Sequence, residues 1–147
     1  MKLSNSFLLF LIIAIFGCSS RQINQVGLTY NELTSSTWQL KSMNGVEVEP
    51  ESYSKGLPEL HFAEDGKMMG STGCNQFMGT YIMDEAKLEI ITGAMTKMAC
   101  PGAGEVEFVN GLSRTVQGSI EENMLHLKEE SGKVHMILNQ MGNHEKK

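Results

Sequence analysis

The chain has 147 residues, with 12 lysines and arginines against 17 aspartates and glutamates, and a formal net charge of −5. This length suits one domain with a hydrophobic core rather than several domains. An acidic chain without a basic patch is a poor match for nucleic acid or for electrostatic adhesion to anionic lipid. We therefore expect no nucleic-acid partner.

Residues 1–17 are predicted to form a secretory signal. One positive charge at Lys2 is followed by ten consecutive apolar residues, Phe7 to Phe16, a run too short to span a membrane as a helix. Gly17 and Cys18, with the polar residues after them, resemble a bacterial lipobox, in which the cysteine becomes the diacylated first residue of the mature protein. An ordinary cleaved signal with an incidental cysteine is the alternative.

Lipidation at Cys18 sets the expected organisation and location. Removal of residues 1–17 from the 147 leaves 130, of which 18–32 are the lipidated N-terminus and tether, 33–139 the domain and 140–147 a polar tail. Because each buried methylene of an acyl chain adds about 0.8 kcal/mol, more than one chain gives a stable membrane anchor. We expect a monomeric lipoprotein of the bacterial cell envelope, held at the outer membrane and facing the periplasm.

If Cys18 carries lipid, two cysteines remain, Cys74 and Cys100. An exported protein with two further cysteines is expected to pair them, and the loop that they close contributes about 3–4 kcal/mol on the chain-entropy model. Two buried free thiols are the first alternative. A metal site is the second, and it ranks last because the sequence has no CxxC motif.

Period-two alternation of apolar residues predicts short strands over most of the domain. A capping-box pattern at Thr29 predicts a helical turn over 30–33 before them. Asn44-Gly45 predicts a type I′ hairpin between the strand that holds Trp38 and its short return strand. Further apolar alternation predicts strands at 46–48, 60–62, 68–70, 81–83, 88–90 and 95–99.

The apolar period changes to that of a helix over 104–118. Glu105 and Glu107 put negative charge in its first turn, where it suits the helix macrodipole. Alternation then returns and predicts two last strands, 125–127 and 134–138. The predicted fold class is α+β, mainly antiparallel β: a small, partly open, barrel-like meander sheet with one amphipathic helix near the C-terminal third.

Two blocks of the domain carry a distinctive pattern. The first, 70–81, combines glycines with Gly-Cys-Asn, an aromatic residue and a tyrosine, and the second, 95–101, reads Thr-x-Met-x-Cys. The positions concerned are Gly70, Gly73, Cys74, Asn75, Phe77, Gly79, Tyr81, Thr96, Met98 and Cys100. In this order, and over about 33–138 as a whole, the sequence resembles the META-domain family, which includes the HslJ-like heat-shock lipoproteins.

The resemblance implies a compact, β-rich, barrel-like domain with one helix, in a cell-envelope setting linked to stress or antibiotic tolerance. It implies no known reaction, cofactor or catalytic residue. The motif suits a structural role, because its glycines permit bends or close backbone approach and Asn75 can bond the backbone of a turn. Phe77 and Tyr81 add ring bulk. Cys74 and Cys100 would tie the first block to the segment before the helix.

The sequence favours a binding or scaffold module over an enzyme. His61, His126 and His135 occupy strand positions that alternate with apolar residues, so we expect them to face solvent. His144 lies in the tail. A small barrel-like sheet can hold an apolar ligand at its mouth or present a face to a partner protein of the envelope. We expect a non-enzymatic lipoprotein that acts by binding or stabilisation under envelope stress, without a cofactor.

Methionine is abundant, which suggests a different function, a carrier or sensor of Cu(I), because thioethers suit this ion. The methionines around the two blocks are Met68, Met69, Met78, Met83, Met95 and Met98, with His61 as a further candidate. Regular spacing of the copper-carrier kind is absent, so we interpret the methionines as fillers of irregular core gaps and predict no metal site. A carrier or sensor of an apolar ligand is a further possible function, and a hidden enzyme is the least favoured.

Overall fold

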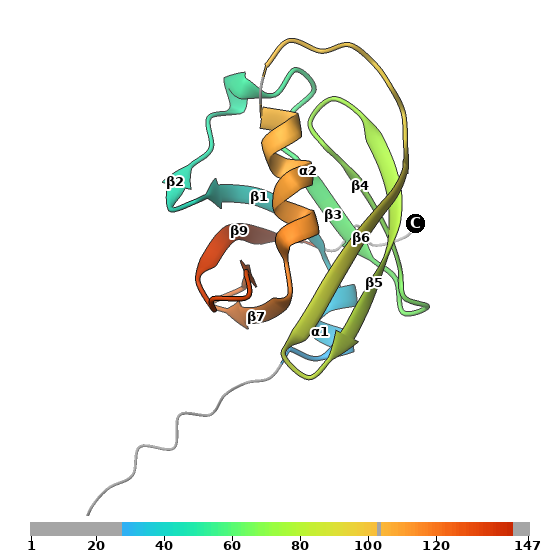
Figure 1. Cartoon of the computed structure of the whole chain (residues 1–147), viewed down its shortest axis with the longest axis vertical. Coiled ribbons are helices and arrows are strands. Elements are labelled where there is room, and N and C mark those ends of the chain that lie inside the picture. The colour runs from blue at the N-terminus through green and yellow to red at the C-terminus, as the bar shows by residue number, and fades with distance from the viewer. Residues whose placement is uncertain (1–27, 103, 143–147) are drawn as a thin grey trace, which may run out of the picture.

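One antiparallel sheet runs around the domain as a ring (Figure 1). The computed structural model describes residues 28–102 and 104–142. The strands are β1 Thr37–Met43, β2 Val46–Glu47, β3 Glu59–Phe62, β4 Lys67–Ser71, β5 Gln76–Asp84, β6 Lys87–Met95, β7 Gln117–Glu121, β8 Met124–Lys128 and β9 Val134–Met141. Their order is β2-β1-β3-β4-β5-β6-β7-β8-β9, and β9 also pairs with β1, so the hydrogen bonding closes on itself. This confirms the predicted fold class.

Tight turns join most neighbouring strands. Asn44 and Gly45 have φ angles of 51° and 82°, which confirms the predicted type I′ hairpin between β1 and β2. The strand predicted over 95–99 is wrong, because β6 extends through Met95 as one strand and 96–101 have no regular structure. A bulge between the pairs Gly79–Thr92 and Phe77–Met95 shifts the register, and this interrupts the alternation that the sequence shows.

Two α-helices and one turn of 3-10 helix (η1, Pro50–Ser52) complete the fold in the described residues. The helix α1, Tyr30–Thr34, confirms the predicted capping box: Thr29 Oγ1 accepts from Glu32 N at 3.2 Å, and Glu32 Oε2 accepts from Thr29 N at 3.2 Å. The second helix, α2 Gly104–Arg114, confirms the predicted late helix but ends before 118. The helix ends at Arg114, because Val116 N, two residues later, donates to Lys128 O of β8 rather than to a carbonyl of the helix.

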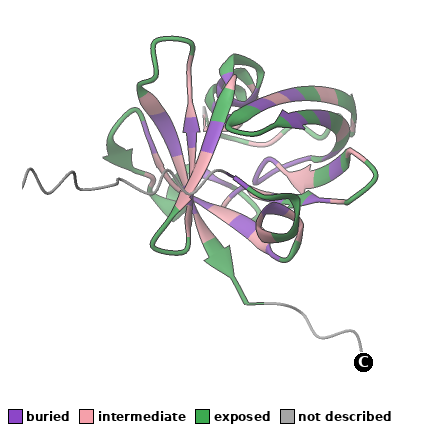
Figure 2. Cartoon of the chain, turned by 90° about the horizontal axis from the view of Figure 1, so that it is seen from below, coloured by how far each residue is buried: buried purple, intermediate pink, exposed green. Residues whose placement is uncertain are grey.

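The interior of the ring is the hydrophobic core, and buried residues alternate with exposed ones along the strands (Figure 2). Its fully buried large side chains are Trp38, Phe62, Phe108, Leu33, Leu40, Leu60, Met68, Leu88, Leu112, Leu125, Leu127 and Met136. Trp38 Nε1 donates to Leu33 O at 2.8 Å, so the indole has a polar partner and fixes α1 beside β1.

The helix α2 lies beside the weakest joint of the ring. In the described residues, β6 and β7 share one pair, Lys87 with Gln117, whereas β5 and β6 pair along almost their whole length. The helix α2 contacts β6, the strand that has only this one pair with β7. Its Phe108 is buried, and the centre of the Phe108 ring lies 6.4 Å from that of Phe77. A Cβ on Gly111 would lie 2.5 Å from Met136 Sδ, so this glycine lets α2 approach β9 closely.

The first and last described residues extend the domain beyond its predicted boundaries at 33 and 139. Leu28 is buried in the core, and β9 extends to Met141, two residues past the predicted boundary at 139. The predicted signal at 1–17, Cys18 and His144 are outside the described residues. Within the described part of the chain, no helix has the length and apolar character needed to cross a membrane.

Candidate functional site

The site is built on the turn between β4 and β5, in the first sequence block. Thr72 N donates to Asn75 O at 2.8 Å, and Asn75 N donates back to Thr72 Oγ1 at 2.8 Å. Gly73 has φ of 81° inside this turn, and a Cβ there would lie 2.6 Å from the ring of Tyr53. Both the backbone angle and the close ring therefore require glycine.

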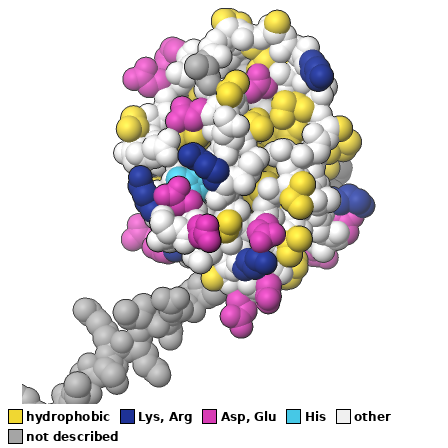
Figure 3. Space-filling view, viewed as in Figure 1, with side chains coloured by type: hydrophobic (Ala, Val, Ile, Leu, Met, Phe, Trp, Pro, Cys, Tyr) yellow, Lys and Arg dark blue, Asp and Glu magenta, His cyan; other side chains and the backbone are white. Residues whose placement is uncertain are grey.

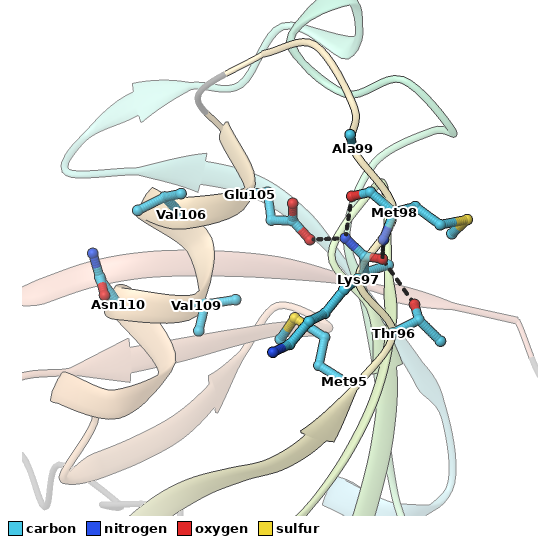
Figure 4. A pocket seen from close by; sticks show the side chains of 10 residues that line it. Met95, Thr96, Lys97, Met98, Ala99, Glu105, Val106, Val109 and Asn110 are labelled. Carbon is cyan, nitrogen blue, oxygen red and sulfur yellow. Dashed lines mark hydrogen bonds between the residues drawn. The ribbon is translucent and has the colours of Figure 1, made fainter.

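The side chain of Asn75 is buried and uses its whole hydrogen-bonding capacity. Its Oδ1 accepts from Met98 N at 2.7 Å and from Thr96 Oγ1 at 2.8 Å. Its Nδ2 donates to Met98 O at 3.2 Å and to Glu105 Oε1 at 2.8 Å. One amide therefore fixes the backbone of the second sequence block and joins it to the first turn of α2 (Figure 4).

Glu105 is the acceptor on the helix. Its Oε1 also accepts from Thr72 Oγ1 at 2.5 Å, so two side chains of the β4–β5 turn hold one carboxylate oxygen. The carboxylate lies in the first turn of α2, where negative charge is favoured by the helix dipole. The sequence predicts Asn75 as a backbone-binding residue of a turn, whereas its contact with Glu105 joins segments 30 residues apart and has no counterpart among the sequence predictions.

A disulfide fixes the other end of the second block. Cys74 and Cys100 are bonded, with their Cα atoms 6.0 Å apart and a sequence separation of 26. This confirms the pairing predicted from the sequence, and it contradicts the two hypotheses of free thiols and of a metal held by these cysteines. The segment 96–100 is thus held at Thr96 and Met98 by Asn75 and at its last residue by a covalent bond.

The remaining motif residues hold the sheet itself. A Cβ on Gly70 would lie 2.3 Å from Glu59 O and 2.9 Å from the ring of Phe77, so this glycine allows the ring to lie over the backbone of β4. A Cβ on Gly79 would lie 2.4 Å from a carbonyl of β6. Tyr81 donates its hydroxyl to Ala63 O at 2.7 Å, and burial raises the pKa of this phenol.

A groove of about 490 Å³ lies between α2 and the segment that the site holds in place. Val106, Val109 and Asn110 of α2 line it, with Lys97 and Met98 on the neighbouring segment, and Figure 4 shows Val109 on the side of the helix that faces this segment. Its full lining is Asn75, Met95, Thr96, Lys97, Met98, Ala99, Glu105, Val106, Val109 and Asn110. Hydrophobic side chains reach the surface there, while charged side chains of both signs are spread over the rest of this face (Figure 3).

A second groove of about 490 Å³ lies on the other side of the end of β6. It shares Met95 and Thr96 with the first groove, and Phe77, Met69 and Met78 also line it. Val106 is 65% exposed, Met78 62% and Met98 42%, although all three are apolar. Large apolar side chains gathered at the surface in this way are typical of an interaction site.

The three histidines of the described residues, His61, His126 and His135, do not line the groove beside α2. His61 is exposed, as predicted, but the prediction that His135 faces solvent is wrong, because it is 2% exposed. Val134 pairs with Lys128, whereas Met136 pairs with the preceding residue of β8, so His135 is the extra residue of a bulge. The bulge turns two successive side chains of β9 to the interior, which simple alternation does not allow.

His135 Nε2 lies 3.2 Å from Thr115 Oγ1, and the Thr115 hydroxyl donates to Gly111 O at 3.2 Å. Because that hydroxyl has one proton, Nε2 of His135 is the donor to it when the proton is given to Gly111 O. Nδ1 of His135 has no hydrogen-bond partner in the described structure. Burial lowers the pKa of His135, and the nearby positive charge of Arg114 lowers it further, against a smaller opposite effect of Glu129.

We expect the free energy of unfolding to fall as the pH is lowered below about 6.5, the pKa of histidine in an unfolded chain. The unfolded chain then binds a proton that the folded protein excludes from His135, whose pKa is lowered. Urea unfolding between pH 7.5 and 5.5 measures this slope. In a His135→Gln variant the slope over this range should become shallower, and an unchanged slope would contradict the assignment to His135.

The site and the fold define a class of small, disulfide-bonded β domains in which a set of buried hydrogen bonds holds a surface segment beside one helix. The model of the META domain family matches residues 31–142, and the chain belongs to this family. The predicted family membership is thereby confirmed. A comparison with curated proteins finds no significant match.

Three solved structures have the same fold. A protein solved by NMR is 28% identical, with a TM-score of 0.60 over 76% of this chain and 94% of its own. A crystal structure of a DUF4847 family protein from Bacteroides vulgatus is 18% identical, with a TM-score of 0.56 over 73% of this chain and 93% of its own. An NMR structure of a protein from Burkholderia xenovorans is 20% identical, with a TM-score of 0.59 over 76% and 85% of the two chains.

Proposed function

We propose that this META-domain protein is a lipid-anchored, non-enzymatic binding module of the bacterial cell envelope, with a role in envelope stress or antibiotic tolerance. Its binding surface is the groove between α2 and the segment 96–100, and its ligand is a small apolar molecule or the apolar side chains of an envelope protein. The observation that carries the proposal is the rigid support of this groove by Asn75 and by the disulfide.

Pre-organisation supports binding at this place. The segment beside the groove has no regular secondary structure, but its position is fixed at two points. The side-chain amide of Asn75 bonds both the N–H and the carbonyl of Met98, and the disulfide holds Cys100. A surface fixed before the ligand arrives loses little ordering entropy on binding. The apolar side chains of the groove favour an apolar ligand, because burying such surface gives about 25 cal/mol per Å².

Chemistry at the site favours binding over catalysis. The amide of Asn75 is fully used by the protein, and Glu105 Oε1 already has two donors. General acid–base catalysis needs a titratable group within hydrogen-bond reach of a substrate proton. The amide of Asn75 instead holds the backbone at Met98, and Glu105 accepts from the side chains of Thr72 and Asn75. The lipobox-like sequence at Cys18 supports the anchor.

A substitution in the groove tests the proposal. We expect Val106→Asp to weaken binding of the neutral apolar probe N-phenyl-1-naphthylamine at least tenfold, measured by fluorescence titration, because a carboxylate makes the groove polar. Val106 is 65% exposed, so the fold should persist. Val46→Asp is the matched control, since Val46 is a 70% exposed valine that does not line this groove. Equal affinity of the two variants would contradict the groove as the binding surface.

The anchor is tested by a separate measurement. The intact mass of the full-length protein extracted from bacterial membranes with detergent should show residues 18–147 with acyl chains on Cys18. A mature protein without added lipid mass would contradict the anchor and leave the groove test unaffected.

A further inference from the structure

A row of soft metal ligands crosses three neighbouring strands on the outer face of the sheet. His61 of β3 pairs directly with Met69 of β4, and Met69 pairs directly with Met78 of β5. Directly paired residues of antiparallel strands point to the same face of a sheet. All three residues are exposed, Met69 by 54% and Met78 by 62%.

The spacing of the row allows its side chains to converge. Neighbouring Cβ atoms in such pairs lie about 5 Å apart, and methionine has three rotatable bonds in its side chain. The thioethers of Met69 and Met78 and the imidazole of His61 can therefore approach one point above β4. Met69 and Met78 also line the second groove, of about 490 Å³, together with Met95, so the row borders a hollow.

The residues that flank the row at its two ends, across the strands, are small, whereas the same face carries Glu59, Lys67, Gln76 and Thr80 along the strands. Thr37 of β1 pairs with His61 at one end. At the other end Gly93 of β6 lies beside Met78, and a Cβ on it would be 2.9 Å from Met78 O. Gly93 therefore adds no side chain beside Met78.

Core filling does not account for Met69 and Met78. Met43, Met68, Met83 and Met136 are buried and fill the core, as predicted from the sequence for methionine in general. Met69 and Met78 leave more than half of their surface in water, where an apolar side chain adds nothing to the core. Core packing therefore does not explain the two exposed thioethers at directly paired positions beside an exposed histidine.

We propose that His61, Met69 and Met78 form a binding site for Cu(I). Thioethers and imidazole are ligands that this soft, singly charged ion prefers, and both are neutral donors here. The row has no carboxylate, and the described residues contain no group of three or more His, Cys, Asp or Glu side chains that could hold a metal ion, so the donor set does not suit Ca²⁺ or Mg²⁺. The site is distinct from the groove beside α2 and goes beyond the proposed function.

The test uses protein that carries Cys18→Ser, so that its two other cysteines are in the disulfide and no thiol competes for the metal. Cu(I) is supplied without oxygen as its acetonitrile complex, and native mass spectrometry counts the bound ions. We expect one ion per chain. Met69→Leu and Met78→Leu should each lower the affinity at least tenfold, and His61→Gln should do the same, as measured by competition with bicinchoninate.

Met124→Leu is the matched control, because Met124 is a partly exposed methionine on β8, which is separated from β3 by β9 and β1. This variant should keep the affinity of the parent protein, and so should Val106→Asp, because Val106 lines only the groove beside α2. Ag(I), which has the same ligand preference and no redox chemistry here, should shift the methyl NMR signals of Met69 and Met78. No bound Cu(I), or an affinity in the Met69→Leu and Met78→Leu variants equal to that of the parent, would overturn the proposal.

Discussion

The variant with both Cys74 and Cys100 replaced by serine is expected to lose about 3–4 kcal/mol of unfolding free energy under oxidising conditions. A bond that spans 26 positions removes this much conformational freedom from the unfolded chain on the chain-entropy model. Urea unfolding with and without a reductant measures the effect. Reduced wild-type protein should match the variant, and the variant itself should not respond to reductant. Equal stability of the oxidised wild type and the variant would contradict this role of the disulfide.

The same variant separates stability from binding. The disulfide holds Cys100, at the end of the segment that borders the groove, whereas Asn75 holds Thr96 and Met98. Removal of the bond should therefore weaken binding of the apolar probe even at temperatures where the fold persists. Probe affinity measured well below the melting temperature reports this second effect.

Asn75→Ala is expected to lower the unfolding free energy by about 2–4 kcal/mol. The substitution leaves Met98 N and Met98 O without partners and removes one donor from Glu105. A buried polar group that loses its partner costs about 1–3 kcal/mol, and the bonds of Asn75 to Met98 are partly buried. Thermal and urea unfolding measure the loss, and hydrogen exchange at the amide of Met98 reports whether the segment opens locally.

Asn110→Ala is the matched control for this substitution. Asn110 is also an asparagine at the same groove, but it is exposed. Substitutions at such surface positions usually change stability by less than about 0.5 kcal/mol. If Asn75→Ala were as mild as Asn110→Ala, the hydrogen bonds of Asn75 would not be what holds the second sequence block.

Local signals in the sequence are sufficient to predict most of the sheet. The Asn44-Gly45 turn, the capping box at Thr29 and the helical period after Gly104 each depend on residues close together in the chain, and all three are confirmed. The bulge at His135 could not be predicted from the sequence. It is defined by the pairing of β9 with β8, in which His135 is the extra residue, and this pairing is not visible in the sequence of β9 alone. The predicted position of this histidine is wrong for that reason.

The candidate site is predictable in part. The motif identifies Asn75, Thr96, Met98 and both cysteines as residues of one structural unit, and the structure brings them together. For Glu105 the sequence indicates only a negative charge that suits a helix start. Its contact with Asn75 depends on how α2 docks on the sheet, and packing of this kind leaves no short-range pattern in a sequence. The acidic first turn after the second cysteine is the one signal that could have indicated it.

The single pair between β6 and β7 has a consequence for aggregation. Past Lys87 and Gln117, the backbone of β6 has no strand beside it on that side in the described structure, and α2 covers this edge. An uncovered strand edge is a template for pairing with another chain. We therefore expect the contacts that dock the start of α2, from Asn75 and Thr72 to Glu105, also to protect the protein from self-association. A chain whose helix detaches would be expected to form intermolecular β-structure from this strand outward.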